Sequence, residues 1–201
     1  MIRVVIAEDQ SLVRDALARL LAMESDIDVV GQAVDGRALI ELVERTRPDL
    51  CLIDIEMPVM SGLAAASLLN QQHPELILVM LTTFGKPGYL QQALGAGARG
   101  FLLKDRPVAE LAVQLRQIRA GIRIVDPELA VNALAEGFNP LSERELEVLR
   151  AAADFGPIGR VAHSLSLTPG TVRNYLSVII QKLGVTNRAE AVAKARAMGW
   201  L

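Results

Sequence analysis

Cys51-Leu52-Ile53-Asp54-Ile55-Glu56-Met57-Pro58 is the stretch around which the chain is organised. An apolar run suited to a buried parallel strand ends in the carboxylate of Asp54, and Pro58 prevents the strand from continuing. Because ligands bind outside the carboxyl ends of strands in open α/β sheets, Asp54 is a candidate reactive group. A lone aspartate at a strand end can equally be a helix N-cap or a loop residue, so the rest of the chain must decide.

Length and composition indicate a globular protein. The chain has 201 residues, of which 51% are hydrophobic, enough for one large or two small domains with buried cores. Its one cysteine, Cys51, cannot form an internal disulfide, which fits a reducing compartment. The N-terminal apolar run is too short for a signal peptide, and no run approaches the roughly 20 apolar residues of a membrane span. We therefore expect a soluble cytoplasmic protein without membrane insertion.

The charge is distributed unevenly along the chain. The formal net charge is −2, yet residues 156–201 carry six Lys or Arg side chains and a single acidic one, Glu190. A basic C-terminal segment behind an acidic front suggests a polyanionic partner for that segment, although solvated helix faces can have the same composition.

Strand and helix patterns alternate five times in residues 1–120. The predicted strands are 2–7, 27–33, a run ending at 54, 76–81 and 101–103, and the predicted helices are 12–23, 37–46, 62–72, 87–94 and 107–119. This alternation predicts a doubly wound five-stranded parallel sheet. In the first helix, Ser11 is the predicted cap, and Leu12, Ala16, Leu20 and Met23 lie at helical spacing.

The pattern changes after residue 120. Residues 121–140 contain two glycines and two prolines and are predicted to be a linker with a helical fragment near 128–136. Residues 141–201 show no strand pattern and are predicted to form helices at 142–153, 158–165, 169–183 and 187–198. Ser142 and Glu145 have the spacing of a capping box. The C-terminal part is thus expected to be an all-α four-helix domain.

Polar side chains follow four of the predicted strands. They are Glu8 and Asp9, Asp54, Thr82 and Lys104. Because these strand ends converge on one edge of a doubly wound sheet, packing alone explains the set poorly. Carboxylates held close together raise each other's pKa unless a cation lies among them, and oxygen ligands with room for water suit Mg²⁺.

These residue types suit phosphoryl transfer. Asp54 is the predicted nucleophile toward phosphorus, forming an aspartyl phosphate. Mg²⁺ and Lys104 would neutralise the phosphoryl oxygens, and the Thr82 hydroxyl would donate a hydrogen bond to one of them. Glu56 is expected to offer its backbone carbonyl to the metal while its side chain points elsewhere.

The order and spacing of these residues resemble the receiver domain of two-component response regulators. The resemblance covers about residues 1–120 and rests on Glu8-Asp9, the Asp54 to Pro58 segment, Thr82, and Phe101-Leu102-Leu103-Lys104. It implies a flavodoxin-like fold, Asp54 as phosphoacceptor, Glu8 and Asp9 as the Mg²⁺ pocket, and Thr82 with Phe101 as the switch pair. Two positions depart from the family: Glu8 replaces an aspartate, and Phe101 lacks the hydroxyl of the usual tyrosine.

Residues 141–201 resemble the LuxR-type helix-turn-helix of the NarL/FixJ regulators. The resemblance rests on 141–145, 170–175, 182–185 and 187–191. Thr168 is the predicted N-cap and Pro169 the first residue of the recognition helix, whose start enters the major groove of DNA. Candidate DNA-binding residues are Thr168, Thr171, Arg173, Asn174, Ser177, Lys182, Arg188 and Arg160. Among these, Arg173 and Asn174 suit base edges, whereas Lys182, Arg188 and Arg160 suit phosphates. The family's usual acid and cap are missing at Pro157-Ile158-Gly159-Arg160, which affects the expected phosphate contacts of that helix.

Together the resemblances imply a response regulator transcription factor and not an enzyme. A cognate histidine kinase would phosphorylate Asp54, and phosphorylation would act through a surface formed by the fourth and fifth helices with Phe101. The expected result is a homodimer that binds double-stranded DNA with two half-sites. The surroundings of Asp54 and Thr82-Thr83-Phe84 are also similar to regulators of membrane-lipid desaturation.

Two other interpretations remain open. A phosphatase would use Asp54 as nucleophile, but such enzymes generally need a second aspartate two residues later, where this chain has Glu56 followed by Pro58. A DNA-binding protein that works independently of phosphorylation would keep the acidic pocket only as a remnant.

Overall fold

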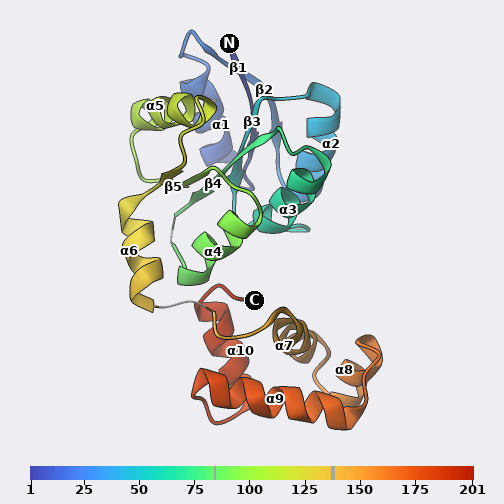
Figure 1. The fold of residues 1–201 in the computed structure, drawn as a ribbon. Coiled ribbons are helices and arrows are strands. Elements are labelled where there is room, and N and C mark those ends of the chain that lie inside the picture. The colour runs from blue at the N-terminus through green and yellow to red at the C-terminus, as the bar shows by residue number, and fades with distance from the viewer. Residues whose placement is uncertain (84, 137–138) are drawn as a thin grey trace. The chain divides into compact units, whose positions relative to one another are not determined.

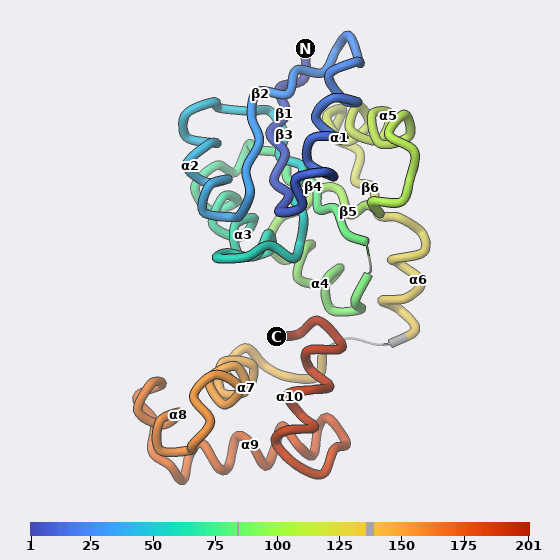
Figure 2. The backbone as a smooth tube through the Cα atoms, turned by 180° about the vertical axis from the view of Figure 1, so that it is seen from behind, coloured from blue at the N-terminus to red at the C-terminus, as the bar shows by residue number. Residues whose placement is uncertain are grey.

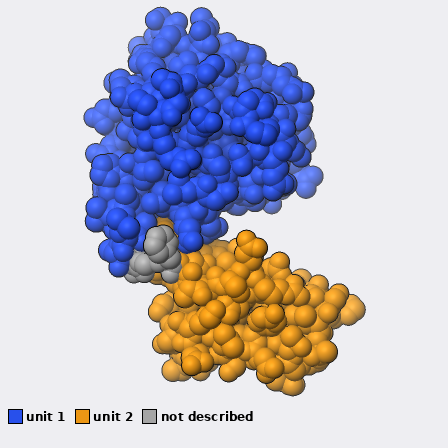
Figure 3. All heavy atoms as spheres, viewed as in Figure 1, with its two compact units in different colours: residues 1–85, 90–135 blue, residues 86–89, 136–201 orange. Residues whose placement is uncertain are grey.

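The computed structural model describes residues 1–83, 85–136 and 139–201. The sequence motif Thr82-Thr83-Phe84 therefore has its last residue outside the described part of the chain. Two compact units are distinguished, one formed by Met1–Gly85 with Leu90–Ala135 and the other by Lys86–Tyr89 with Glu136–Leu201 (Figure 3).

The first unit is built on a parallel sheet. Its strands are β1 (Ile2–Ala7), β2 (Ile27–Ala33), β3 (Leu50–Asp54), β4 (Ile77–Thr82), β5 (Gly100–Leu103) and β6 (Ile124–Val125), in the order β2-β1-β3-β4-β5-β6. The helices between and after them are α1 (Ser11–Leu21), α2 (Gly36–Thr46), α3 (Gly62–Gln72), α4 (Pro87–Gly95), α5 (Val108–Arg119) and α6 (Pro127–Glu136). The doubly wound, flavodoxin-like architecture predicted from the sequence is confirmed.

Helices cover both faces of this sheet. Figures 1 and 2 show α1 and α5 against one face and α2 and α3 against the other. All residues of β3 and β4 are buried, as expected for central parallel strands covered on both sides. Apolar side chains of α1 and α5 pack with those of β1, β3 and β4 in one continuous core. The carboxyl ends of β1 and β3 meet where the strand order reverses, which is where ligands bind in such sheets.

A sixth strand adds to the five that the sequence predicted. β6 lies within the segment predicted to be a linker and pairs in parallel with β5, matching Gly100 with Ile124 and Phe101 with Val125. The segment has too few residues for alternation to be visible, and Gly121 and Pro127 on either side are typical of loops. The pairing is long-range, so no local pattern reveals it.

Helix α1 differs from its prediction. Ser11 is the first helical residue rather than the cap, and the preceding Gln10 makes no side-chain capping bond. The buried residues of the helix are Ala18 and Leu21. Three of the four residues at the predicted spacing are large and exposed: Leu12 is 82% exposed, Leu20 44% and Met23 79%. The spacing correctly predicted a helix. The apolar residues at that spacing are exposed, however, and the face of α1 that carries Ala18 and Leu21 packs on the sheet.

The described part of the second unit contains four helices after residue 140. They are α7 (Glu143–Phe155), α8 (Ile158–Ser164), α9 (Pro169–Leu183) and α10 (Arg188–Ala197). The predicted capping box is present, because the Ser142 side chain accepts from the Glu145 backbone N–H while the Glu145 carboxylate accepts from the Ser142 N–H. Thr168 caps α9 and Pro169 begins it, as predicted. At α8 the capping position is Pro157, which makes no side-chain cap bond.

The start of α3 packs tightly against the backbone of the strand end that carries Asp54. The Gly62 N–H donates to the Ile55 carbonyl at 3.0 Å. A Cβ atom at Gly62 would lie 1.8 Å from the Asp54 carbonyl oxygen, a distance that no packed side chain can adopt. Glycine at this position therefore allows α3 to support the end of β3.

Replacing Gly62 with alanine is expected to push α3 away from β3 and to lower the free energy of unfolding by about 1–3 kcal/mol, as overpacked sites do. Gly95→Ala is the matched control in α4, because a Cβ there meets no described atom within 4 Å. That control is expected to change stability by less than about 1 kcal/mol. Urea unfolding followed by far-UV circular dichroism measures both, and equal stabilities would contradict the close contact.

Candidate functional site

Three carboxylates gather at the carboxyl ends of β1 and β3. Asp54 is the last residue of β3, and Glu8 and Asp9 follow β1 directly. One carboxylate oxygen from each lies within 4.8 Å of the others. Glu8 is 1% exposed and Asp54 6%, whereas Asp9 is exposed. The sequence prediction that these acids converge is therefore met by the geometry.

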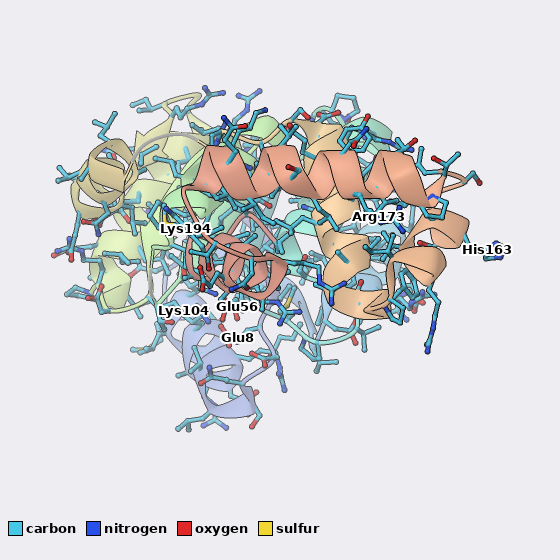
Figure 4. The ribbon with its side chains drawn as sticks, turned by 90° about the horizontal axis from the view of Figure 1, so that it is seen from below. Glu8, Glu56, Lys104, His163, Arg173 and Lys194 are labelled. Atoms are coloured by element: carbon cyan, nitrogen blue, oxygen red, sulfur yellow. The ribbon has the colours of Figure 1, made fainter. Side chains whose placement is uncertain are left out.

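Lys104 places a positive charge between two of these acids. Its ammonium nitrogen lies 2.6 Å from Glu8 Oε2 and 3.0 Å from Asp54 Oδ1. Its backbone N–H donates to the Thr82 carbonyl at 2.9 Å, which holds Lys104 at the end of β5 beside β4. Figure 4 labels Glu8, which follows β1, and Lys104, which follows β5. The chain thus neutralises part of its buried negative charge with its own lysine.

Burial and pairing shift the pKa of each group in this cluster. Burial raises the pKa of Asp54, and hydrogen bonding to Lys104 opposes the shift without cancelling it. Burial likewise raises the pKa of Glu8, with the Lys104 hydrogen bond acting in the opposite direction and the Asp54 charge adding to the rise. For Lys104, burial lowers the pKa, but the bonds to Glu8 and Asp54 outweigh it, so its pKa is raised. Lys104 therefore stays charged.

Arg14 was not predicted as a site residue, yet it fixes the backbone of the acidic pair. Its guanidinium Nη1 donates to the Glu8 carbonyl at 2.7 Å and to the Asp9 carbonyl at 3.3 Å. The Gln10 N–H also donates to Glu8 Oε1 at 3.2 Å. These bonds hold the loop after β1 so that both acids stay at the strand end. An arginine on a half-exposed helix gives no local sign of such a role, so the sequence alone did not identify it.

The remaining residues of the predicted site differ in accessibility. Thr82 is 4% exposed at the end of β4, and Phe101 is 1% exposed within β5. Glu56 has an exposed side chain, and the role of its backbone carbonyl as a metal ligand stays a prediction. The buried Phe101 ring is not part of the receiver surface in this conformation.

The acidic cluster has the donor set that a divalent cation needs. Carboxylate oxygens are the hard ligands that Mg²⁺ prefers, and the exposed Asp9 leaves one side open to water. Glu8, Asp9 and Asp54 therefore fit a shared magnesium ion.

The raised carboxyl pKa values predict a pH-dependent stability in metal-free buffer. The stability contributed by Asp54 and Glu8 is complete below their ordinary pKa values of 3.8 and 4.5 and is lost as pH rises through the higher folded pKa values. Because ionised Asp54 is disfavoured in the folded state, Asp54→Asn is expected to raise the unfolding midpoint at pH 7 and to lose this advantage toward pH 4. Differential scanning calorimetry with a chelator tests this, and a lower midpoint at pH 7 would show that the ionised group is stabilising.

The second candidate site is the outer face of α9. Arg173, Asn174 and Ser177 are exposed on it, as predicted, while Val172, Leu176, Ile179 and Leu183 on the opposite side are buried in the core of the second unit. The Thr168 and Thr171 hydroxyls lie 2.9 Å apart at the start of the helix, where Thr168 also accepts from the Thr171 N–H. Figure 4 shows Arg173 on this helix.

A hollow of about 490 Å³ runs beside α9. Its lining comes from α8, α9 and the turn into α10 and consists of Ile158, Arg173, Leu176, Ser177, Ile180, Thr186 and Arg188. Arg173 supplies an exposed cation in this lining that suits a phosphate of a nucleic-acid backbone, whereas the Thr186 hydroxyl donates to Glu190 Oε1 at 2.8 Å and Arg188 donates to the Gly156 carbonyl. Thr186 and Ile158 were not among the predicted residues, because the turn into α10 approaches α9 only in the folded unit.

Two of the predicted phosphate-binding residues also have partners inside the second unit. The Lys182 ammonium lies 2.8 Å from Glu145 Oε2, and the Glu145 side chain is only 7% exposed. A guanidinium N–H of Arg188 donates to the Gly156 carbonyl at the end of α7. Both side chains thus help to hold α7 to α9 and α10, whereas Arg160 is exposed on α8.

Comparisons with known proteins agree with this division of the chain. Residues 4–116 match the response regulator receiver domain, and residues 139–195 match the luxR family of bacterial regulatory proteins. The chain is 45% identical to transcriptional regulatory protein DesR of Bacillus subtilis (strain 168), covering 100% of this chain and 99% of that protein. It is 34% identical to the probable transcriptional regulatory protein NarL of Mycobacterium tuberculosis (strain ATCC 25618 / H37Rv), covering 96% and 93%.

Solved structures with the same fold include two regulators that match nearly the whole of this chain. The response regulator ChrA of a heme-sensing two-component system has a TM-score of 0.59 at 32% identity and covers 100% of this chain and 98% of its own. The RcsB response regulator in a DNA complex has a TM-score of 0.66 at 23% identity, with 98% coverage of both chains, and shows likeness of fold alone. Among the described residues, no helix has the length and apolar character needed to cross a bilayer.

Proposed function

Because this chain belongs to the NarL/FixJ family of response regulators, with a receiver domain and a LuxR-type DNA-binding domain, we propose that a histidine kinase phosphorylates it on Asp54 and so controls its binding to DNA. The observation that carries the proposal is the pairing of Lys104 with both Asp54 and Glu8, in a cluster that also includes Asp9. Few arrangements other than a phosphoryl site need a buried nucleophilic acid, an acidic pocket and a lysine at the same sheet edge.

The reaction transfers a phosphoryl group from a kinase phosphohistidine to an Asp54 carboxylate oxygen. The phosphorus–nitrogen bond breaks, its electron pair stays with the imidazole, and a phosphorus–oxygen bond to Asp54 forms. Glu8, Asp9 and the Glu56 carbonyl are the residues that would hold Mg²⁺, which supplies charge neutralisation for the phosphoryl oxygens. The raised pKa of Lys104 keeps its ammonium charged, and the Thr82 hydroxyl is a donor for a phosphoryl oxygen.

The relatives decide between regulator and enzyme. The curated proteins that match over nearly the whole chain are transcriptional regulators, and the chain is a transcription regulator rather than a phosphatase. The remaining alternative is a regulator that does not use phosphorylation. Such a protein would not be labelled on Asp54 by a phosphodonor.

A small phosphodonor with Mg²⁺ is expected to label the wild-type chain with one hydroxylamine-sensitive phosphoryl group, because Asp54 at the end of β3 is paired with Lys104 while the neighbouring Glu8 and Asp9 are the proposed metal ligands. Asp54→Asn is expected to abolish the label. Asp28→Asn, at an exposed position of β2, should be labelled like the wild type. Intact-protein mass spectrometry measures this, and an unlabelled wild type, or a label that survives in Asp54→Asn, would refute the proposal.

Phosphorylation is proposed to promote homodimerisation. Exposed apolar side chains support association of the receiver through α1 and the turn that follows it, where Leu12, Leu20 and Met23 are accessible. The surface expected from the fourth and fifth helices with Phe101 has less support, because Phe101 is 1% exposed. Light scattering of the labelled and unlabelled samples decides whether phosphorylation changes the oligomeric state.

DNA recognition is proposed to occur through α9 in the major groove, with each protomer of a dimer contacting one half-site. Arg173 and Asn174 are exposed and suited to base edges, while the exposed Arg160 on α8 is suited to phosphates. The contribution of Lys182 is expected to be indirect, because its ammonium is bonded to Glu145.

Arg173→Ala is expected to weaken specific binding by about 1–3 kcal/mol and to relax the preferred sequence, if the arginine pairs with a base. Lys182→Ala serves as the comparison: it should destabilise the second unit by leaving Glu145 without its cation, yet keep the preferred sequence. In vitro selection of bound DNA, together with thermal unfolding, separates the two effects. An unchanged selected sequence for Arg173→Ala would remove Arg173 from base recognition.

A further inference from the structure

The segment after α5 is attached to the strand that leads to Lys104. The Ile124 N–H donates to the Arg99 carbonyl at 3.0 Å, and the Asp126 N–H donates to the Phe101 carbonyl at 2.9 Å. β6 therefore pairs with the first two residues of β5, and the chain enters α6 shortly after it. Figure 2 shows β6 beside β5, with α6 following it.

Asp126 joins this segment to the loop that follows Lys104. Its side chain is 3% exposed, and Arg106, two residues after Lys104, donates to it from Nε to Oδ2 at 3.2 Å and from Nη2 to Oδ1 at 3.4 Å. The same carboxylate accepts from the Glu128 N–H at 3.0 Å, in the first turn of α6. A buried carboxylate requires such partners, so Asp126 fixes the Lys104 loop and the start of α6 to each other.

Helix α6 also contacts the loop that follows Thr82. Leu129 is 3% exposed, and a Cβ atom at Gly85 would lie 2.1 Å from Leu129 Cδ2, so this side chain covers Gly85 closely. The opposite side of α6 is open, with Val131 63% and Leu134 74% exposed. A helix held on one side by few contacts opens easily, and its order depends on those contacts.

We propose that Asp126 is a positioning residue for Lys104 and couples the phosphorylation site to α6, the helix that precedes the DNA-binding domain in the chain. The inference rests on the proposed phosphorylation of Asp54. A phosphoryl group on Asp54 gives Lys104 a new anionic partner, and movement of the lysine shifts Arg106 in the same loop. The Arg106–Asp126 pair then changes, and with it the cap and the order of α6. Coupling of this kind is reciprocal, so loosening Asp126 also alters the reactivity of Asp54.

The experiment uses the full chain and hydrogen–deuterium exchange of α6 with and without a small phosphodonor and Mg²⁺. In the wild type, phosphorylation is expected to change amide exchange in residues 128–135 by about fivefold or more, the lower end of typical couplings. Asp126→Asn keeps the size of the side chain and a capping oxygen but removes the ion pair. Its α6 is expected to exchange at one rate in both states, and its Asp54 should be labelled at an altered rate.

Two further variants isolate the role of the ion pair. Arg106→Gln removes the same pair from the other side and leaves Asp126 in place as the cap, so it should reproduce the loss of the phosphorylation response. Asp26→Asn removes a more exposed Arg–Asp pair of the same domain, in which Asp26 accepts from Arg116 at 2.7 Å and Arg116 also pairs with Glu24. This control is expected to respond to phosphorylation like the wild type.

The outcomes distinguish this coupling from the phosphorylation itself. A wild type that is not labelled refutes the proposed function. A labelled wild type with unchanged α6 exchange overturns the coupling alone, as does a wild-type response in both Asp126→Asn and Arg106→Gln. If Asp126→Asn fails to fold, Arg106→Gln alone decides. Loss of the response in Asp26→Asn as well would show a general loss of stability and would also overturn the specific role of Asp126.

Discussion

The ion pairs of Lys104 with Glu8 and Asp54 are the interaction on which the receiver domain depends. Two carboxylates that are almost fully buried at one sheet edge would repel each other, and the lysine makes their burial tolerable. The lysine follows β5, and the two acids lie at the ends of β1 and β3. The strand order therefore brings the three side chains together. A change in the charge of Asp54 therefore alters the electrostatic interaction of Lys104 at the end of β5.

The surrounding structure is arranged to keep this edge in place. Gly62 allows α3 to rest on the Asp54 backbone, Arg14 holds the carbonyls of the acidic loop, and the Thr82 carbonyl anchors the Lys104 backbone. The DNA-binding domain is stabilised in a comparable way by one buried acid, since Glu145 completes the cap of α7 and accepts from Lys182 on α9. In both domains a buried carboxylate connects elements that are distant in sequence.

The sequence predicted those features whose causes are local. An apolar run that ends in Asp54, the Thr168-Pro169 start of α9 and the Ser142–Glu145 capping box all depend on neighbouring residues, and the structure contains each of them. Features that depend on distant partners were missed or altered. Three features arise only when remote segments of the chain come into contact. They are the pairing of β6 with β5, the face of α1 that packs on the sheet, and the ion pair of Lys182 with Glu145.

The pairing of β6 with β5 also covers one edge of the receiver sheet. Without β6, the backbone N–H and C=O groups along the outer side of β5 would form an open sheet edge, which invites pairing with other chains and aggregation. β6 occupies that edge with only two residues, and Pro127, two residues after Val125, prevents a longer strand from forming a new template. A receiver fragment for solution work should accordingly extend through α6 rather than stop at residue 120.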